Sequence, residues 1–383
     1  MSALLLRGGQ VLLESGLRAI DLGAGPDGLE LDPHGPARAF DARGLLVLPG
    51  IVDLHGDAFE RQLQPRPGIG FLPGLALADT ESQLLGCGIT TAYHGVTLSW
   101  EPGLRGIEAW RAWLDAMEAH ASRAVCDMRI HLRFEAHALD VADEAEADIA
   151  AGRVHLLSFN DHLPEILRKL ADPVTGAKFA ARGPLALPAF RALAERVAAG
   201  GSGIPATRDR LAAAARTAGL PMASHDDATL AARDGFRALG ARICDFPMNE
   251  AVARAATEAG DAVLMGCPNV VRGGSHLGWA SAATMAETGL CSVLASDYFY
   301  PAMLPAAFVL AARGRLDLRA AWAMLSANPA RAAGLVDRGR IAQGLRADLV
   351  VVDARGTLPH VVATVAAGRL AWLGAQGAAL LGG

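Results

Sequence analysis

Short apolar runs alternate with longer alanine-rich runs along most of this chain. The short runs have the length of β-strands, and the alanine-rich runs consist of residues that favour helices. Eight strands are predicted in this way, at 45–52, 88–96, 128–135, 154–162, 220–227, 241–248, 261–271 and 291–298. Predicted helices between them include 189–198, 208–218, 249–259 and 280–288. Strands and helices in this alternation predict an α/β fold, a (β/α)8 TIM-like barrel over residues 48–339.

The two ends of the chain follow a different pattern. Residues 1–47 and 340–383 alternate apolar and polar positions, interrupted by Gly, Pro and Asp at turn spacing. This pattern is typical of short antiparallel strands. We therefore expect both chain ends to form one small β-sandwich domain beside the barrel.

Composition narrows the class of protein without naming a function. Hydrophobic residues make up 52% of the 383 residues and charged ones 20%, which suits a well-buried globular chain. The net charge of -5, without a basic stripe, argues against nucleic acid as a partner. No apolar run reaches the roughly 18 residues of a membrane span. The start lacks a signal peptide's basic region, and the five cysteines are scattered without a CxxC pair, so we expect a cytoplasmic protein with reduced thiols.

Metal-ligand residue types stand at the carboxyl ends of several predicted strands. They are His55 and Asp57 after the first strand, Glu135 after the third, His162 after the fourth, His225 after the fifth and Asp297 after the eighth. A barrel gathers these ends around one mouth. Imidazole and carboxylate groups bind divalent metals, and two such ions can share a carboxylate. The pattern predicts one or two divalent ions, zinc first, with manganese, iron or nickel as alternatives.

Each of these residues also has a purely structural explanation. A single buried histidine is commonly hydrogen-bonded in a core, Asp227 can cap the following helix, and Glu135 can pair with Arg133. Because the same residue types recur at one strand end after another, the metal interpretation is favoured. We expect Asp161, Asp226 and Asp227 to stand behind the ligands and orient the histidines or a sugar.

Arginines near these strand ends suggest that the mouth binds an anion. The segment after the seventh strand contains Arg272, Gly273, Gly274, Ser275 and His276, which offer a guanidinium, backbone N–H groups and side-chain donors. Arg66 lies between two prolines, and Arg133 shares a strand face with Glu135. Two structural alternatives remain. Arg272 can be a solvated residue in a flexible glycine turn, and Arg66 can serve only to hold its loop in place.

Several segments resemble a known superfamily. LPGIVDLHGD (48–57), GITT (88–91) and NPARAAGLVDRGRIAQGLRADLVVVD (328–353) resemble the amidohydrolase superfamily. Other segments are similar to the PhnM-type proteins of bacterial phosphonate breakdown: FERQLQPRPG (59–68), HLRFE (131–135), ASHDDAT (223–229), LMGCPNVVRGGSH (264–276) and SDYFYP (296–301). The resemblance runs through nearly the whole chain.

The resemblance implies a fold, a reaction and a role for one residue. It implies a metal-dependent barrel that hydrolyses ribose 1-methylphosphonate 5-triphosphate to the 5-phosphate and pyrophosphate, with Asp297 accepting and returning the proton. A small phosphorylated sugar would be the substrate, and a second copy of the chain or other phosphonate-pathway enzymes would be the protein partners. Two departures stand out: His55-Gly56-Asp57 replaces the superfamily's frequent His-x-His, and the sixth strand ends in Phe246-Pro247 without a histidine.

Two other functions stay open from the sequence. One is hydrolysis of a C–N bond in an N-acyl, cyclic amide or amine substrate, for which the same metal ligands would serve but the arginines would have less to do. The other is an inactive barrel that only binds or scaffolds, for which eroded ligand positions would be expected.

Overall fold

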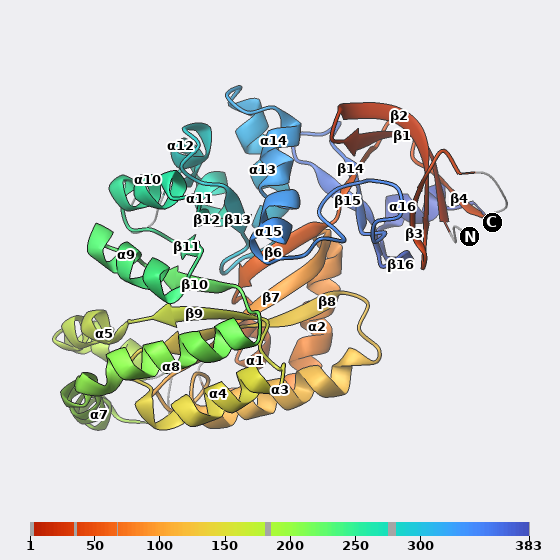
Figure 1. The fold of residues 1–383 in the computed structure, drawn as a ribbon. Coiled ribbons are helices and arrows are strands. Elements are labelled where there is room, and N and C mark those ends of the chain that lie inside the picture. The colour runs from red at the N-terminus through yellow and green to blue at the C-terminus, as the bar shows by residue number, and fades with distance from the viewer. Residues whose placement is uncertain (1–3, 34–36, 67, 181–184, 275–280, 383) are drawn as a thin grey trace.

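Eight parallel strands form the centre of the computed structural model, which describes residues 4–33, 37–66, 68–180, 185–274 and 281–382 (Figure 1). The strands are hydrogen-bonded in chain order from β6 to β13. The eight predicted strands and the TIM-like barrel are thereby confirmed. The strands are β6 (Ile51–Gly56), β7 (Ile89–Leu98), β8 (Asp127–Glu135), β9 (Leu156–Asn160), β10 (Met222–His225), β11 (Ile243–Asp245), β12 (Ala262–Gly266) and β13 (Val293–Ala295).

Helices cover the outer face of these strands (Figure 1). Their buried faces are rich in alanine and leucine, so that they pack closely against the apolar outer face of the sheet. The helices of the barrel region are α1 (Glu60–Leu63), α2 (Pro73–Gly86), α3 (Ile107–Ala121), α4 (Ala142–Ala150), α5 (Leu163–Leu170), α6 (Pro173–Ala180), α7 (Leu187–Ala199), α8 (Ile204–Thr217), α9 (Leu230–Leu239), α10 (Glu250–Glu258), α11 (Cys267–Arg272), α12 (Ala282–Glu287), α13 (Met303–Ala312), α14 (Leu318–Ala323) and α15 (Ala327–Ala332). The helix α16 (Ala375–Leu380) packs instead against the sheet that the chain ends form. Short 3-10 turns are η1 (Leu139–Val141), η2 (Gly201–Gly203) and η3 (Tyr300–Ala302). No helix within the described ranges has the length and apolar character that a membrane span requires.

Both chain ends meet in a second sheet, as predicted. It contains β1 (Leu4–Leu13), β2 (Gly16–Gly25), β3 (Gly28–Leu31), β4 (Arg38–Asp41), β5 (Leu46–Pro49), β14 (Leu349–Asp353), β15 (His360–Ala366) and β16 (Arg369–Leu373). The expected antiparallel pairing is confirmed for most neighbouring strands, but β4 and β5 both run parallel to β1. The chain returns to β1 after the β2–β3 hairpin in the same direction as before, and the sheet is therefore mixed.

The predicted seventh strand is too long. Strand β12 ends at Gly266, and the apolar residues after it form the short helix α11. Pro268 stands in the first turn of this helix, where its missing N–H and fixed φ angle are tolerated. A short apolar run does not separate a strand from a buried helical turn, which explains the error.

The barrel closes between its first and last strands at the carboxyl end. The only backbone pairing between β6 and the segment after β13 in the described residues is an isolated parallel bridge from Gly56 to Asp297. It is supported by hydrogen bonds from Asp297 N to His55 O (2.8 Å) and from Asp57 N to Asp297 O (3.0 Å). The buried Asp53 carboxylate also accepts from the backbone N of Ser296 (3.0 Å). Residues predicted as metal ligands therefore stand on both sides of this closure.

Candidate metal centre

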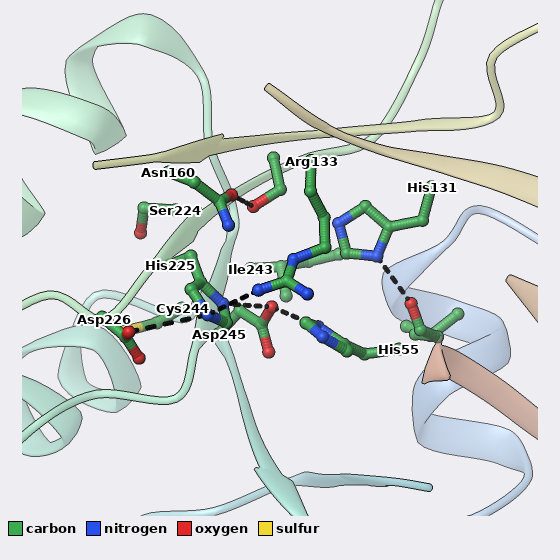
Figure 2. A network of polar contacts seen from close by, with 12 residues as sticks. His55, His131, Arg133, Asn160, Ser224, His225, Asp226, Ile243, Cys244 and Asp245 are labelled. Atoms are coloured by element: carbon green, nitrogen blue, oxygen red, sulfur yellow. Dashed lines mark hydrogen bonds and ion pairs between the residues drawn. The ribbon is translucent and has the colours of Figure 1, made fainter. Parts of the chain in front are cut away.

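A buried carboxylate joins two histidines from different strands at the mouth (Figure 2). Asp245 Oδ2 lies 2.7 Å from His55 Nδ1 and 3.0 Å from His225 Nδ1. The three residues end or nearly end β11, β6 and β10, and Asp245 is 1% exposed. Burial alone would raise the pKa of Asp245, but His55 and His225 hold it well below its usual range. Asp245 therefore stays ionised between the two rings.

A second carboxylate holds the third histidine. Glu135, at the end of β8, contacts His162 Nδ1 through one oxygen and accepts from the His162 backbone N through the other (3.1 Å). Burial alone would lower the pKa of His162, but the Glu135 carboxylate raises it to about 9. Because both Glu135 oxygens face His162, this structure assigns Glu135 to orienting that ring, rather than to the ligand position expected from the sequence.

The Nε2 atoms of His162 and His225 face further polar groups. Asp226 Oδ2 lies 3.6 Å from Nε2 of both His162 and His225. The Arg133 guanidinium lies 3.2 Å from His225 Nε2 and 3.4 Å from Asp57 Oδ2. Asp226, expected only to orient other residues, thus stands among the groups that can bind a cation.

This donor set fits a divalent metal. All three histidines have Nδ1 against a carboxylate, an arrangement that fixes the ring and leaves Nε2 as the coordinating atom. Nε2 atoms of two of them converge with an acidic oxygen, since His162, His225 and Asp226 offer ligand atoms within 4.8 Å of one another. Asp57 and Asp297 add carboxylates from the two sides of the barrel closure.

Three residues at the mouth have left-handed backbone conformations that side chains rarely adopt. Asp226 has φ 58°, Phe246 φ 53° and Asp297 φ 55°, each directly after a strand or one residue beyond it. Such strain gathers at functional sites, where it aims a side chain in a direction that the strand itself would not allow. Gly266 makes room for one of them, because a Cβ there would lie 3.1 Å from Asp297 Oδ2.

Asp297 has the properties of a group that exchanges protons near neutral pH. Burial, reinforced by the nearby Asp57 carboxylate, raises the pKa of Asp297 to about 7. Its neighbours His55 and Arg133 act in the opposite direction but do not cancel this effect. The sequence predicts this residue as both ligand and proton acceptor, and the structure places it at the mouth beside Asp57.

Arginines surround one tyrosine next to Asp297. Arg272 Nη1 donates to Tyr298 Oη at 3.3 Å, and the Arg61 guanidinium lies 5.9 Å from the centre of the Tyr298 ring. Both arginines are exposed. The predicted backbone grip of Gly273 and Gly274 is wrong for this structure, because their N–H groups donate to the carbonyls of 270 and 269 and end α11. Ser275 and His276 lie outside the described residues.

Three other predicted site residues lie apart from the metal-ligand groups. Arg66 is exposed, and its contact is a backbone bridge to the nearby residue 69. Asp161 lies 3.7 Å from His137 and 3.6 Å from Arg208. Asp227 accepts from Ser224 and pairs with Arg233 (3.2 Å), and it does not cap α9, whose cap is Thr229. Within the described residues, the ion pairs and hydrogen bonds of Asp161 and Asp227 are not made with His55, His162 or His225. Their expected role in orienting a sugar stays a prediction.

Sequence reasoning missed Asp245, Arg61 and Tyr298. The signal for Asp245 was present, because it closes the sixth strand just as other acids close theirs, but the search at that strand was for a histidine. Arg61 and Tyr298 carried no signal of their own, since their relation depends on how the first and eighth loops meet.

Comparisons with known proteins give consistent results. The sequence profile of the amidohydrolase family matches residues 46–371. Alpha-D-ribose 1-methylphosphonate 5-triphosphate diphosphatase of Escherichia coli (strain K12) is 32% identical over 331 residues, which make up 84% of this chain and 87% of that protein. Among solved structures, betaaspartyl dipeptidase of Fervidobacterium islandicum-AW-1 is similar with a TM-score of 0.63 and 13% identity, covering 97% of both chains. Dihydropyrimidinase of Brevibacillus agri NCHU1002 has a TM-score of 0.58 and 14% identity, covering 96% of this chain and 94% of that one. At these identities the solved structures establish the fold alone.

Proposed function

This chain belongs to the amidohydrolase family, and from that premise we propose that it is a metal-dependent hydrolase that releases pyrophosphate from ribose 1-methylphosphonate 5-triphosphate or a close analogue. The observation that carries the proposal is one mouth that holds both a metal-ligand cluster and several arginines. The E. coli relative, whose name states this diphosphatase activity, supports the choice of substrate.

The proposed chemistry divides among the residues of the mouth. A divalent ion, zinc first, would be held by Nε2 of His55, His162 and His225 with nearby carboxylates, and when bound it lowers the pKa of water toward neutrality. Asp297 accepts the proton of the attacking water and returns it to the leaving group, because its pKa lies near 7. Glu135 keeps His162 in place.

The arginines would bind the charged substrate. Arg133 is almost fully buried at the ligand cluster, and its guanidinium can stabilise charge that develops on the reacting phosphorus. Arg272 and Arg61 flank Tyr298 at the rim, where they can hold the leaving pyrophosphate. An uncharged amide substrate would need the ions but would offer these arginines no anionic group to bind.

Phosphorus NMR of the metal-loaded protein with this triphosphate tests the proposal. We expect pyrophosphate and the corresponding 5-phosphate to appear together, and analogues with fewer phosphates to react more slowly, because the remote phosphates help to orient the reacting one. N-acyl and cyclic amide compounds serve as the control substrates. Hydrolysis of one of these without any pyrophosphate would replace the proposal with the C–N alternative. Binding of the triphosphate without turnover of any compound would favour a binding barrel.

A further inference from the structure

Asp245 ends β11, the sixth strand of the barrel, and it contacts two histidines at once. Both contacts are made by the same oxygen, Oδ2, at 2.7 Å from His55 Nδ1 and 3.0 Å from His225 Nδ1. The other oxygen, Oδ1, is buried and has no hydrogen-bond partner among the described residues. Figure 2 shows the carboxylate between the two rings. Within the described residues, the hydrogen bonds of the Asp245 carboxylate are therefore made only with the two histidines.

The distances identify these contacts as hydrogen bonds. Two donors on one tetrahedral ion, each about 2.0–2.2 Å from it, stand roughly 3.3–3.6 Å apart. The distances from Asp245 Oδ2 are shorter and fall in the hydrogen-bond range. One carboxylate oxygen can accept two N–H groups, which requires a proton on Nδ1 of both rings. In a neutral imidazole, a proton on Nδ1 leaves the lone pair on Nε2.

The surroundings of the His225 ring agree with this orientation. His225 Nε2 faces Arg133 at 3.2 Å and Asp226 at 3.6 Å, on the side of the other ligand groups. The Phe246 ring, set by its left-handed backbone, lies against both histidines with centroid distances of 5.1 Å to His55 and 5.5 Å to His225. This ring helps to keep water from the Asp245 bonds, so that they hold the two imidazoles firmly.

We propose that Asp245 is the positioning residue for both His55 and His225: its carboxylate accepts a hydrogen bond from the Nδ1–H of each ring, keeps the ring proton on Nδ1, and so presents both Nε2 atoms to the metal. The inference rests on the metal dependence in the proposed function but not on the substrate. His55, His225 and Asp245 also offer ligand atoms within 4.8 Å of one another, but in this proposal Asp245 binds the two rings and not the ion. Asp245, on the sixth strand, thus acts on the metal only by orienting His55 on the first strand and His225 on the fifth.

Two measurements test this role. The first uses the unaltered protein, labelled with 15N at its histidines and loaded with zinc, and reads the protonation of each ring from long-range 1H–15N spectra, assigned with His55→Gln and His225→Gln. We expect both rings to carry the proton on Nδ1 and the metal on Nε2. Metal on Nδ1 of either ring would overturn the proposal, because Asp245 could not then accept a proton from it.

The second measurement compares zinc affinity and zinc content, by elemental analysis, in Asp245→Asn and in a matched control. Asparagine has the same shape but only one acceptor oxygen, so we expect a 10–100-fold weaker affinity, as is typical when a ligand-orienting group is lost. The control is Asp261→Asn, another buried carboxylate, whose ion pairs within the described residues are with Arg233, Arg237 and Arg242 and with no histidine. It should keep the zinc affinity of the unaltered protein.

The outcomes separate this inference from the proposed function. Equal zinc affinity in Asp245→Asn and the unaltered protein overturns the role of Asp245 and leaves the hydrolase proposal standing. A lowered affinity with Nδ1 protonated, but without pyrophosphate release by the unaltered protein, supports the role and removes the proposed substrate. An unaltered protein that binds no divalent ion overturns both. If Asp245→Asn does not fold, the ring protonation in the unaltered protein decides alone.

Discussion

The two ends of the barrel use the same acidic side chains for different purposes. At the carboxyl ends of the strands, Asp245 and Glu135 accept from histidines, whose second ring nitrogen stays available for a metal. At the amino ends, Asp127 pairs with Arg129 at 3.0 Å and also contacts Arg338. Arginine remains charged and offers no lone pair to an ion, so these pairs can only hold the structure together.

The difference shows that the partner of a carboxylate, more than its place at a strand end, decides what it does. The buried Arg338 also donates to Thr91 on β7 (2.9 Å), and Arg346 pairs with Asp348 (2.8 Å) just before β14. This lower network joins the barrel to the segment that enters the small sheet. In TIM-like barrels the amino-terminal face serves stability and the carboxyl-terminal face serves chemistry, and the two kinds of partner follow that division.

The largest loss of activity should come from substitutions at the carboxyl ends of the strands, here called the upper end. Asp297→Asn removes the proton acceptor while keeping the side chain's shape, and we expect kcat for pyrophosphate release to fall roughly 10²–10⁴-fold. His55→Ala should also abolish turnover, through loss of a ligand. Urea unfolding of both variants checks that they remain folded. A folded variant with near-normal kcat would show that the upper end is not where the chemistry occurs.

At the amino ends of the strands, here called the lower end, Arg338→Met should lower the stability of the protein and leave its activity unchanged. Arg338 is buried and is one of two arginines that pair with the partly buried Asp127. Its removal leaves Asp127 with Arg129 alone, and we expect the free energy of unfolding to fall by about 3 kcal/mol. The activity of each folded molecule should not change. Urea titration followed by kcat measurement on the folded fraction tests both statements. A selective loss of kcat without loss of stability would contradict the division between the two ends.

Arg272→Ala tests the rim of the mouth. A charge-assisted hydrogen bond to phosphate contributes roughly 1.5–3 kcal/mol, so we expect KM for the triphosphate to rise about 10- to 100-fold. Zinc content should stay the same, because Arg272 contacts Tyr298 and none of the ligand groups. Unchanged affinity for the triphosphate would make Arg272 a solvated residue at the end of a helix.

The smallest effect concerns His94, in the barrel wall between the two ends. Both its ring nitrogens are buried without a hydrogen-bond partner in the described residues, against Phe59 and Trp113, and burial lowers the pKa of His94 to about 3. The unfolded chain takes up a proton near pH 6.5 and the folded chain does not. Between pH 7 and pH 5.5 the free energy of unfolding should therefore fall by about 1.3 kcal/mol through this group.

Urea midpoints of the unaltered protein and His94→Leu at pH 7 and pH 5.5 measure this contribution. The unaltered protein should lose more stability on acidification than the variant. Identical losses would mean that His94 has a hydrogen-bonding partner and titrates in the folded state as it does in the unfolded one.

Periodicity predicted the fold well because each strand and helix carries its own local pattern. The eight barrel strands and the union of both chain ends follow from that pattern. The grouping of acidic residues at the mouth was harder to predict, because it depends on the direction of each side chain. Asp226 and Asp227 are neighbours in sequence, yet the first faces His162 and His225 while the second faces Arg233. The left-handed backbone at Asp226, which turns it toward the mouth, has no signature in the sequence.

The isolated bridge between Gly56 and Asp297 closes the barrel between residues that lie far apart in the sequence. Joining these distant residues costs loop-closure entropy, while the hydrogen bonds there are few. A ligand that binds His55 and Asp297 together binds only the closed barrel, and its binding free energy therefore stabilises the closure. The amide hydrogens at 57 and 297 should thus exchange with deuterium faster than those at the centre of β7 and β8. Ligand binding should slow the exchange at 57 and 297 more than elsewhere.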